Sequence, residues 1–189
     1  SKFICVGYLG GVTRARGCLK TLESLLRLKD QYGYKLGYVC IGRFESEAFK
    51  QELDALGKRL DYYFAPGYMA FNDAIEYIAK SHIGMALLDR TPNYINSYPT
   101  KIFEYMALGM PFLVSDFDIN KEIVEQNECG YALPPESAEH LDTLLKELID
   151  SERTREELGR NGKANVFKYS WNSQLNTLAT SYQQWLAKK

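Results

Sequence analysis

The chain has 189 residues, of which 46% are hydrophobic and 25% are charged, and its 23 basic and 24 acidic side chains leave a formal net charge of -1. These values exclude disordered, collagen-like and coiled-coil chains, and the balanced charge argues against a nucleic-acid partner. No apolar run approaches the roughly 20 residues of a membrane-spanning helix, so we expect no transmembrane segment. The cysteines lack metal-ligand spacing, and we expect buried, reduced thiols of a cytoplasmic protein without a metal site; they are Cys5, Cys18, Cys40 and Cys129.

The first half of the chain alternates short apolar runs with segments of helical periodicity. Short apolar runs that end at glycine or proline are typical of strands buried on both faces, and they lie at residues 3–6, 36–41 and 62–64. Helices are expected between and after them, at 19–28, at 46–57 with Ser46 as a cap, and at 72–79.

The second half continues the alternation and then becomes wholly helical. Strands are expected at 82–88, 111–114 and 131–133, helices between them at 99–108 and 119–124, and three final helices at 141–148, 155–167 and 175–186. Strict alternation implies crossover connections and a parallel sheet with helices on both faces. The sequence therefore predicts one α/β domain over residues 1–189, a doubly wound, Rossmann-like sheet of six strands with extra C-terminal helices.

Ligands of such sheets bind outside the carboxyl ends of the strands. The loop after the first strand carries Gly10, Gly11 and Arg16 before it opens into a helix. Glycines let backbone amides approach a ligand closely, and a helix N-terminus beside arginine favours an anion. The loop therefore indicates a phosphate site, although it has neither dinucleotide-binding nor Walker spacing.

The crossover after the fourth strand holds a second group of candidate residues. Ser97 can cap a helix whose first turn contains Pro99, so that the amides of Thr100 and Lys101 would face an anion. Glu104 lies one turn deeper on the same helix face and can accept both hydroxyls of a ribose. The alternative is a solvated helical charge, but the apolar neighbours of Glu104 favour a binding role.

Residues 99–111, PTKIFEYMALGMP, resemble the signature of the retaining glycosyltransferases of family 4, which have the GT-B fold. Residues 7–17, 79–88, 122–130 and 169–171 are similar to further segments of that family. The resemblance implies a nucleotide sugar as substrate, with UDP or GDP as the nucleotide, bound without a metal. Residues Asp116-Phe117-Asp118 have the Asp-x-Asp pattern of a metal-binding motif, but they follow the fifth strand, away from the phosphate loops. We expect them to cap the next helix.

The resemblance also assigns roles to individual positions. Arg16 and the loop of Gly10 and Gly11 would bind the diphosphate. The start of the helix at Thr100 and Lys101 would meet the phosphates and the donor sugar, and Glu104 would bind the ribose. No catalytic residue is assigned in this half of the fold. The predicted substrate-binding residues are Gly10, Gly11, Arg16, Gly42, Arg43, Phe64, Ala65, Gly67, Asn96, Tyr98, Thr100, Lys101 and Glu104.

Two positions depart from the family pattern. Asn96 stands where the first glutamate of the E-x7-E motif is expected, and it can still bond a sugar hydroxyl but carries no charge. Tyr8 stands where an arginine is often found, and Arg14 or Arg16 could replace that charge. Tyr98, together with Tyr94, is expected either to stack on a sugar or to pack within the loop.

GT-B enzymes have two such domains, and the chain resembles only the carboxy-terminal, donor-binding one. We therefore expect the chain to be a domain excised from a longer enzyme. We expect it to be inactive without the N-terminal acceptor domain of that enzyme. Whether the longer enzyme associates peripherally with a membrane is left open. An apolar stripe on the last helix, Leu175, Leu178, Tyr182 and Trp185, would pack either in the core or on the missing half. The alternative function is a non-catalytic nucleotide-binding or interaction module of Rossmann type.

Overall fold

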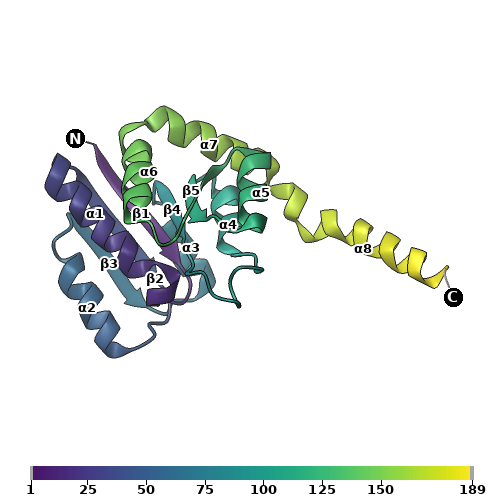
Figure 1. The fold of residues 1–189 in the computed structure, drawn as a ribbon, viewed down its shortest axis with the longest axis horizontal. Helices are drawn as coiled ribbons and strands as arrows, with labels where there is room; N and C mark the ends of the chain where they lie inside the picture. The colour runs from purple at the N-terminus through teal and green to yellow at the C-terminus, as the bar shows by residue number, and fades with distance from the viewer. Residues whose placement is uncertain (1, 188–189) are drawn as a thin grey trace.

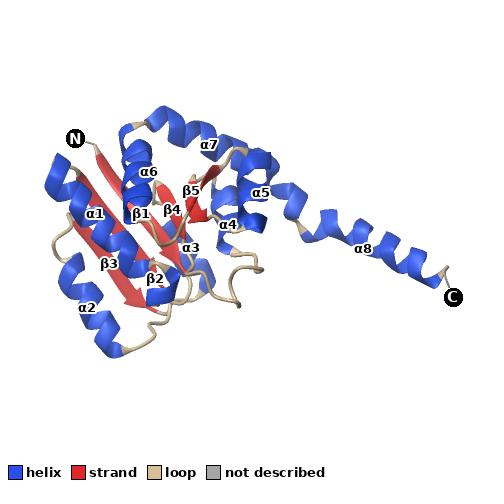
Figure 2. Cartoon of the chain, viewed as in Figure 1, coloured by secondary structure: helices blue, strands red, loops and turns tan. Residues whose placement is uncertain are grey.

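Six parallel strands form a single sheet in the computed structural model, which describes residues 2–187. Their spatial order is β3-β2-β1-β4-β5-β6, so the chain starts in the middle of the sheet and builds outward twice (Figure 2). This arrangement confirms the predicted doubly wound α/β fold. The strands are β1 Phe3–Leu9, β2 Lys35–Ile41, β3 Tyr62–Gly67, β4 Ile83–Ala86, β5 Phe112–Ser115 and β6 Gly130–Leu133.

Helices cover both faces of the sheet (Figure 1). One face packs against α1 Cys18–Tyr32, α2 Glu47–Gly57 and α6 Ala138–Asp150, and the other against α3 Phe71–Ile78, α4 Lys101–Leu108 and α5 Asp118–Asn127. Side chains of a strand alternate between the two faces, and accordingly Ile4 and Val6 enter the first core and Cys5 the second. Helix α7, Glu152–Asn165, packs against α4.

Serine side chains fix the starts of several helices, and the cap at Ser46 is the one that the sequence predicts. Ser46 accepts a hydrogen bond from the Phe49 amide at the start of α2, and Ser137 and Ser151 do the same for α6 and α7. Helix α5 differs from the expectation, because Phe117 is its N-cap and no side chain caps it. Asp116 instead pairs with Arg90 at 2.7 Å.

Strand β1 is three residues longer than the sequence predicts. Tyr8 and Leu9 continue the pairing with Cys40 and Ile41 of β2, which carries the strand to the edge of the glycine loop. The turn η1, Arg14–Arg16, then leads into α1. All four cysteines are buried and free, as expected. Of the helices within residues 2–187, none combines the length and apolar character that a membrane span requires.

The chain ends in a helix that leaves the body of the domain. After η2, Val166–Tyr169, helix α8, Trp171–Leu186, projects away from the sheet and its covering helices (Figure 1). The apolar stripe on it is exposed, at 43% for Leu178 and 61% for Tyr182. Packing of this stripe in the core of the chain, one of two expectations, is therefore wrong, because α8 reaches no core.

Candidate functional site

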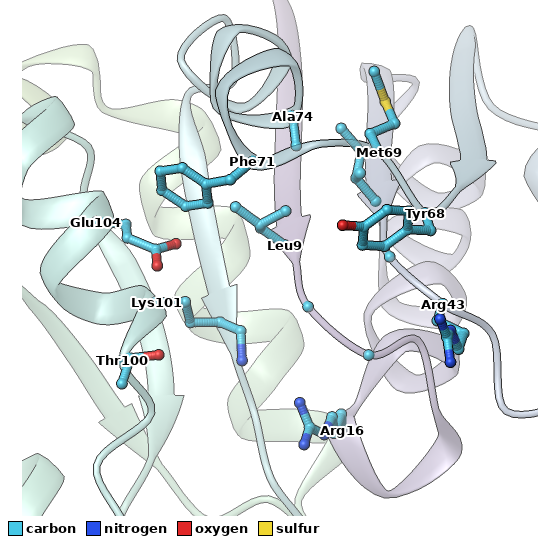
Figure 3. Close-up of a pocket in the computed structure, with 14 residues that line it drawn as sticks. Leu9, Arg16, Arg43, Tyr68, Met69, Phe71, Ala74, Thr100, Lys101 and Glu104 are labelled. Atoms are coloured by element: carbon cyan, nitrogen blue, oxygen red, sulfur yellow. The ribbon is translucent and has the colours of Figure 1, made fainter.

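A cavity of about 470 Å³ opens at the carboxyl ends of β1 and β2 (Figure 3). The strand order reverses between β1 and β4, and such a reversal leaves a crevice where ligands of open α/β sheets bind. Helix α4, which follows β4, forms the opposite wall. The lining residues are Leu9, Gly10, Gly11, Arg16, Ile41, Gly42, Arg43, Tyr68, Met69, Phe71, Ala74, Thr100, Lys101 and Glu104.

Two glycines in contact form the floor of the cavity. The Gly10 amide donates to the Ile41 carbonyl at 2.9 Å, which holds the loop after β1 against the end of β2. Gly42 has φ +151°, and a β-carbon there would lie 1.7 Å from the Gly10 oxygen. Only glycine fits at position 42, because any side chain would push the two loops apart.

Two cations face the cavity from opposite sides. In Figure 3 the Lys101 ammonium, on α4, points toward the Arg16 guanidinium on η1. Lys101 is 8% exposed. Burial, together with the charge of Arg16, lowers the pKa of Lys101 to about 8. The Tyr94 hydroxyl raises the pKa of Arg16, so Arg16 remains a cation throughout the physiological range. The pair is suited to an anion that offers oxygens to both.

The carboxylate of Glu104 lies just under one helical turn beyond Lys101 and points into the cavity, with the Phe71 ring on the same side (Figure 3). Partial burial raises the pKa of Glu104, and the nearby Lys101 charge offsets part of that rise. Within residues 2–187, no hydrogen bond or ion pair engages this carboxylate. Its oxygens are therefore available to the hydroxyl groups of a ligand.

The apolar wall of the cavity was not predicted from the sequence. Tyr68, Met69 and Phe71 follow β3 and approach the cavity from the segment that enters α3. Tyr68 and Phe71 are 75% and 56% exposed. The signal was present in the sequence as an aromatic and methionine cluster directly after the turn at Pro66 and Gly67.

The structure brings together eight of the predicted residues, which line the cavity: Gly10, Gly11, Arg16, Gly42, Arg43, Thr100, Lys101 and Glu104. Gly67 supports the floor, because its carbonyl accepts from the Gly42 amide at 2.9 Å. Phe64 and Ala65 lie elsewhere, in a separate hollow beside α2. They belong to the edge strand β3, and the Phe64 ring stacks on Tyr77 at 4.7 Å.

Asn96 and Tyr98 are exposed in the loop before α4 and do not line the cavity. Tyr98 packs against Phe103, with ring centroids 6.0 Å apart. Ser97 does not cap α4: its hydroxyl donates to the Tyr94 carbonyl at 3.0 Å, because the chain turns here before the helix begins. Thr100 is the N-cap, without a side-chain bond.

Arg14 does not replace the arginine expected at position 8. It lies outside the cavity, where it pairs with Glu45 and Glu52 and rests on the Phe49 ring. Tyr94 packs on Arg16, whose guanidinium carbon lies 5.8 Å from the ring centre. The cavity therefore has two buried or half-buried cations, one from η1 and one from α4.

A family model for glycosyl transferases group 1 matches residues 1–165, so the chain belongs to this family. A search of curated proteins found no match. Among solved structures, the chain is similar to the C-terminal domain of a glycosyl transferase group 1 family protein, LpcC, from Francisella tularensis. The TM-score is 0.70 at 20% sequence identity, and the match covers 89% of this chain and 87% of the LpcC domain.

Two longer structures share the fold. A glycosyltransferase from Rickettsia africae matches with a TM-score of 0.77 at 17% identity, over 100% of this chain and 49% of that one. Alr3699/HepE from Anabaena was solved in complex with UDP and glucose. It matches with a TM-score of 0.74 at 15% sequence identity, and the match covers 96% of this chain and 48% of Alr3699/HepE. The chain thus has the fold of one domain of GT-B glycosyltransferases and spans about half the length of these two proteins.

Proposed function

We propose that the chain is the nucleotide-sugar-binding half of a retaining, family 4 glycosyltransferase that uses a UDP- or GDP-sugar. One observation carries this proposal: a single cavity at the reversal of strand order combines a glycine floor, two buried or half-buried cations, a half-buried carboxylate and an apolar wall. Each of these features matches one part of a nucleoside diphosphate, which is a dianion, a pentose and a flat base.

The parts of the ligand follow from the chemistry of the walls. The diphosphate lies over Gly10 and Gly11 between Arg16 and Lys101, where backbone amides and the N-terminus of α4 add positive potential. The ribose hydroxyls donate to Glu104. The base lies against the apolar wall that includes Tyr68, since aromatic side chains offer a flat contact surface.

Glycosyl transfer breaks the bond between the anomeric carbon and a diphosphate oxygen, and the nucleoside diphosphate leaves with that electron pair. An acceptor hydroxyl forms the new bond on the same face of the sugar and passes its proton to the departing diphosphate oxygen on that face. Arg16, Lys101 and the loop amides stabilise the charge on the leaving oxygen as it develops. Because two side-chain cations face this charge, we propose that transfer needs no metal.

The acceptor half is proposed to lie outside this chain. Structures with the same fold are about twice as long. The stripe on α8 exposes Leu175, Leu178, Tyr182 and Trp185, and a contiguous exposed apolar surface often marks an interaction site. We propose that α8 packs on an N-terminal domain of the same polypeptide, and that the 189-residue chain binds its nucleotide without transferring sugar.

Calorimetry with UDP, GDP and uridine tests the nucleotide site. Arg16→Ala should weaken UDP or GDP binding more than about tenfold and leave uridine binding unchanged, because only the diphosphates carry the charge that Arg16 meets. Arg14→Ala is the matched control, since Arg14 lies outside the cavity. Chelation of divalent metals should not alter the affinity. Absence of binding by every nucleotide, or an equal loss for UDP and uridine, contradicts the proposed site.

A further inference from the structure

Lys101 is a nearly buried cation that lacks an anionic partner. It is 8% exposed, and within residues 2–187 no ion pair or hydrogen bond engages its ammonium group. Burial and the neighbouring Arg16 charge oppose protonation and outweigh the attraction of the Glu104 carboxylate, so the pKa of Lys101 is lowered. A charge withdrawn from water needs compensation from its surroundings, and Glu104 supplies only part of it.

The ring of Tyr8 provides further compensation. The Lys101 nitrogen lies over the ring, 5.1 Å from its centre. Tyr8 is 1% exposed, and its hydroxyl donates to the Gly11 carbonyl at 2.6 Å, so the ring cannot turn away. The face of an aromatic ring attracts a cation, and the attraction strengthens where water is excluded.

The glycine loop places each cation over its own glycine. A β-carbon built on Gly10 would lie 3.6 Å from the Lys101 nitrogen, and one built on Gly11 would lie 3.6 Å from a guanidinium nitrogen of Arg16. The two charges therefore stand over consecutive residues of the loop. Two linked phosphates on that loop would each meet one cation.

We propose that Tyr8 is a positioning residue for the diphosphate: its ring holds the Lys101 ammonium over Gly10, so that Lys101 binds one phosphate and Arg16 the other. This inference rests on the proposed function and assigns the basis of its diphosphate selectivity. Tyr8 itself touches neither phosphate, because it lies beneath the loop and is almost wholly buried.

A pair of isosteric rings at position 8 tests the inference in the full 189-residue chain. Tyr8→Phe keeps the ring and the negative electrostatic potential of its face. Pentafluorophenylalanine incorporated at position 8 keeps the shape of the ring but makes the potential of that face positive. The fluorinated chain should bind UDP about tenfold more weakly than Tyr8→Phe, with equal uridine affinity. The two variants differ in no hydrogen bond, so a difference confined to UDP reports on the cation.

A double-mutant cycle supplies the second test. Lys101→Met should weaken UDP binding, and Tyr8→Leu should do the same with uridine binding unchanged. Combined, the two substitutions should cost clearly less than the sum of their separate losses, because the ring acts through the ammonium. The part that stays additive reflects the Tyr8 hydroxyl, which bonds the Gly11 carbonyl and lies beside Arg16. Thermal unfolding checks that each variant is folded, and if Tyr8→Leu is not, the isosteric pair still decides.

Equal UDP affinity for the two isosteric rings overturns the inference, as does full additivity in the cycle or a parallel loss of UDP and uridine. Any of these results leaves the proposed function standing, provided that the unmodified chain binds UDP or GDP. If the unmodified chain binds no nucleoside diphosphate, the proposed function itself fails, so the two failures are distinguishable.

Discussion

Lys101 and Glu104 are separated by less than one helical turn, and burial opposes the charge on both. In the absence of ligand, the ammonium costs stability and the carboxylate is left without a hydrogen-bond donor. Groups held in this state are a common mark of a binding site, where the ligand provides what the fold does not. At the residue scale, the cavity is therefore suited to a molecule that carries both negative charge and hydroxyl groups.

The pKa of Lys101 makes a prediction about stability and pH. The unfolded chain has an ordinary lysine pKa of 10.5, and the folded chain one of about 8. Between these values the unfolded state binds more protons, so stability rises with pH. From pH 7.5 to 9.5 the free energy of unfolding should increase by about 2 kcal/mol more in the unmodified chain than in Lys101→Met.

Urea unfolding at the two pH values measures this difference, with Lys58→Met as an exposed-lysine control that should behave like the unmodified chain. An identical pH dependence in the unmodified chain and Lys101→Met would show that Lys101 keeps an ordinary pKa. UDP affinity should change in the opposite direction and fall as the pH rises through about 8, because only the ammonium attracts the diphosphate.

Glu104 makes a prediction about the sugar of the nucleotide. If its carboxylate accepts from the ribose, the unmodified chain should prefer UDP to 2′-deoxy-UDP, and Glu104→Ala should weaken UDP binding by about 1–3 kcal/mol and abolish that preference. Calorimetry with both nucleotides measures the effect. Glu125→Ala, an exposed carboxylate on α5, is the matched control. Retention of the preference in Glu104→Ala removes Glu104 from the ribose site.

At the scale of elements, the cavity exists because two loops approach each other at backbone distance. Gly42→Ala should cost about 3 kcal/mol of stability and greatly weaken UDP binding, since the new β-carbon would overlap the Gly10 carbonyl. Gly33→Ala is the matched control. Gly33 also has a positive φ, but a β-carbon added there would meet no atom within 4 Å. We therefore expect Gly33→Ala to lose about 1 kcal/mol of stability and to bind UDP with normal affinity.

Chemical denaturation and calorimetry on the two variants separate backbone strain from steric overlap. If both alanine variants lose the same stability and both bind UDP normally, the contact between the loops does not shape the cavity.

At the scale of the whole molecule, helices α8 and α6 differ in how far their leucine side chains are buried. Both carry leucines at helical spacing, but Leu178 is 43% exposed and Leu145 is fully buried. In this chain, Leu178→Ala should change the free energy of unfolding by less than about 0.5 kcal/mol, whereas Leu145→Ala should cost about 2–5 kcal/mol. Urea unfolding compares the two. A large cost for Leu178→Ala would mean that α8 packs on the body of this chain in solution.

Local rules were sufficient for most of the fold. Short apolar runs, several of them closed by glycine or proline, predicted the six strands, Ser46 was predicted as the cap of α2, and strict alternation predicted the parallel, doubly wound sheet. These features depend on neighbours in the sequence, and so the sequence reveals them. The loop of Gly10, Gly11 and Arg16 and the helix face of Thr100, Lys101 and Glu104 were predicted for the same reason.

What remained depended on contacts between distant segments. The family resemblance placed Phe64 and Ala65 among the substrate-binding residues, and the local sequence placed Ser97 at a helix cap. Neither could show which way an edge strand or a turn would direct side chains. Tyr8 appeared only as a departure from a family pattern. Its position beneath Lys101, some 90 residues later in the chain, exists only once β1 and α4 pack together, and tertiary structure alone decided it.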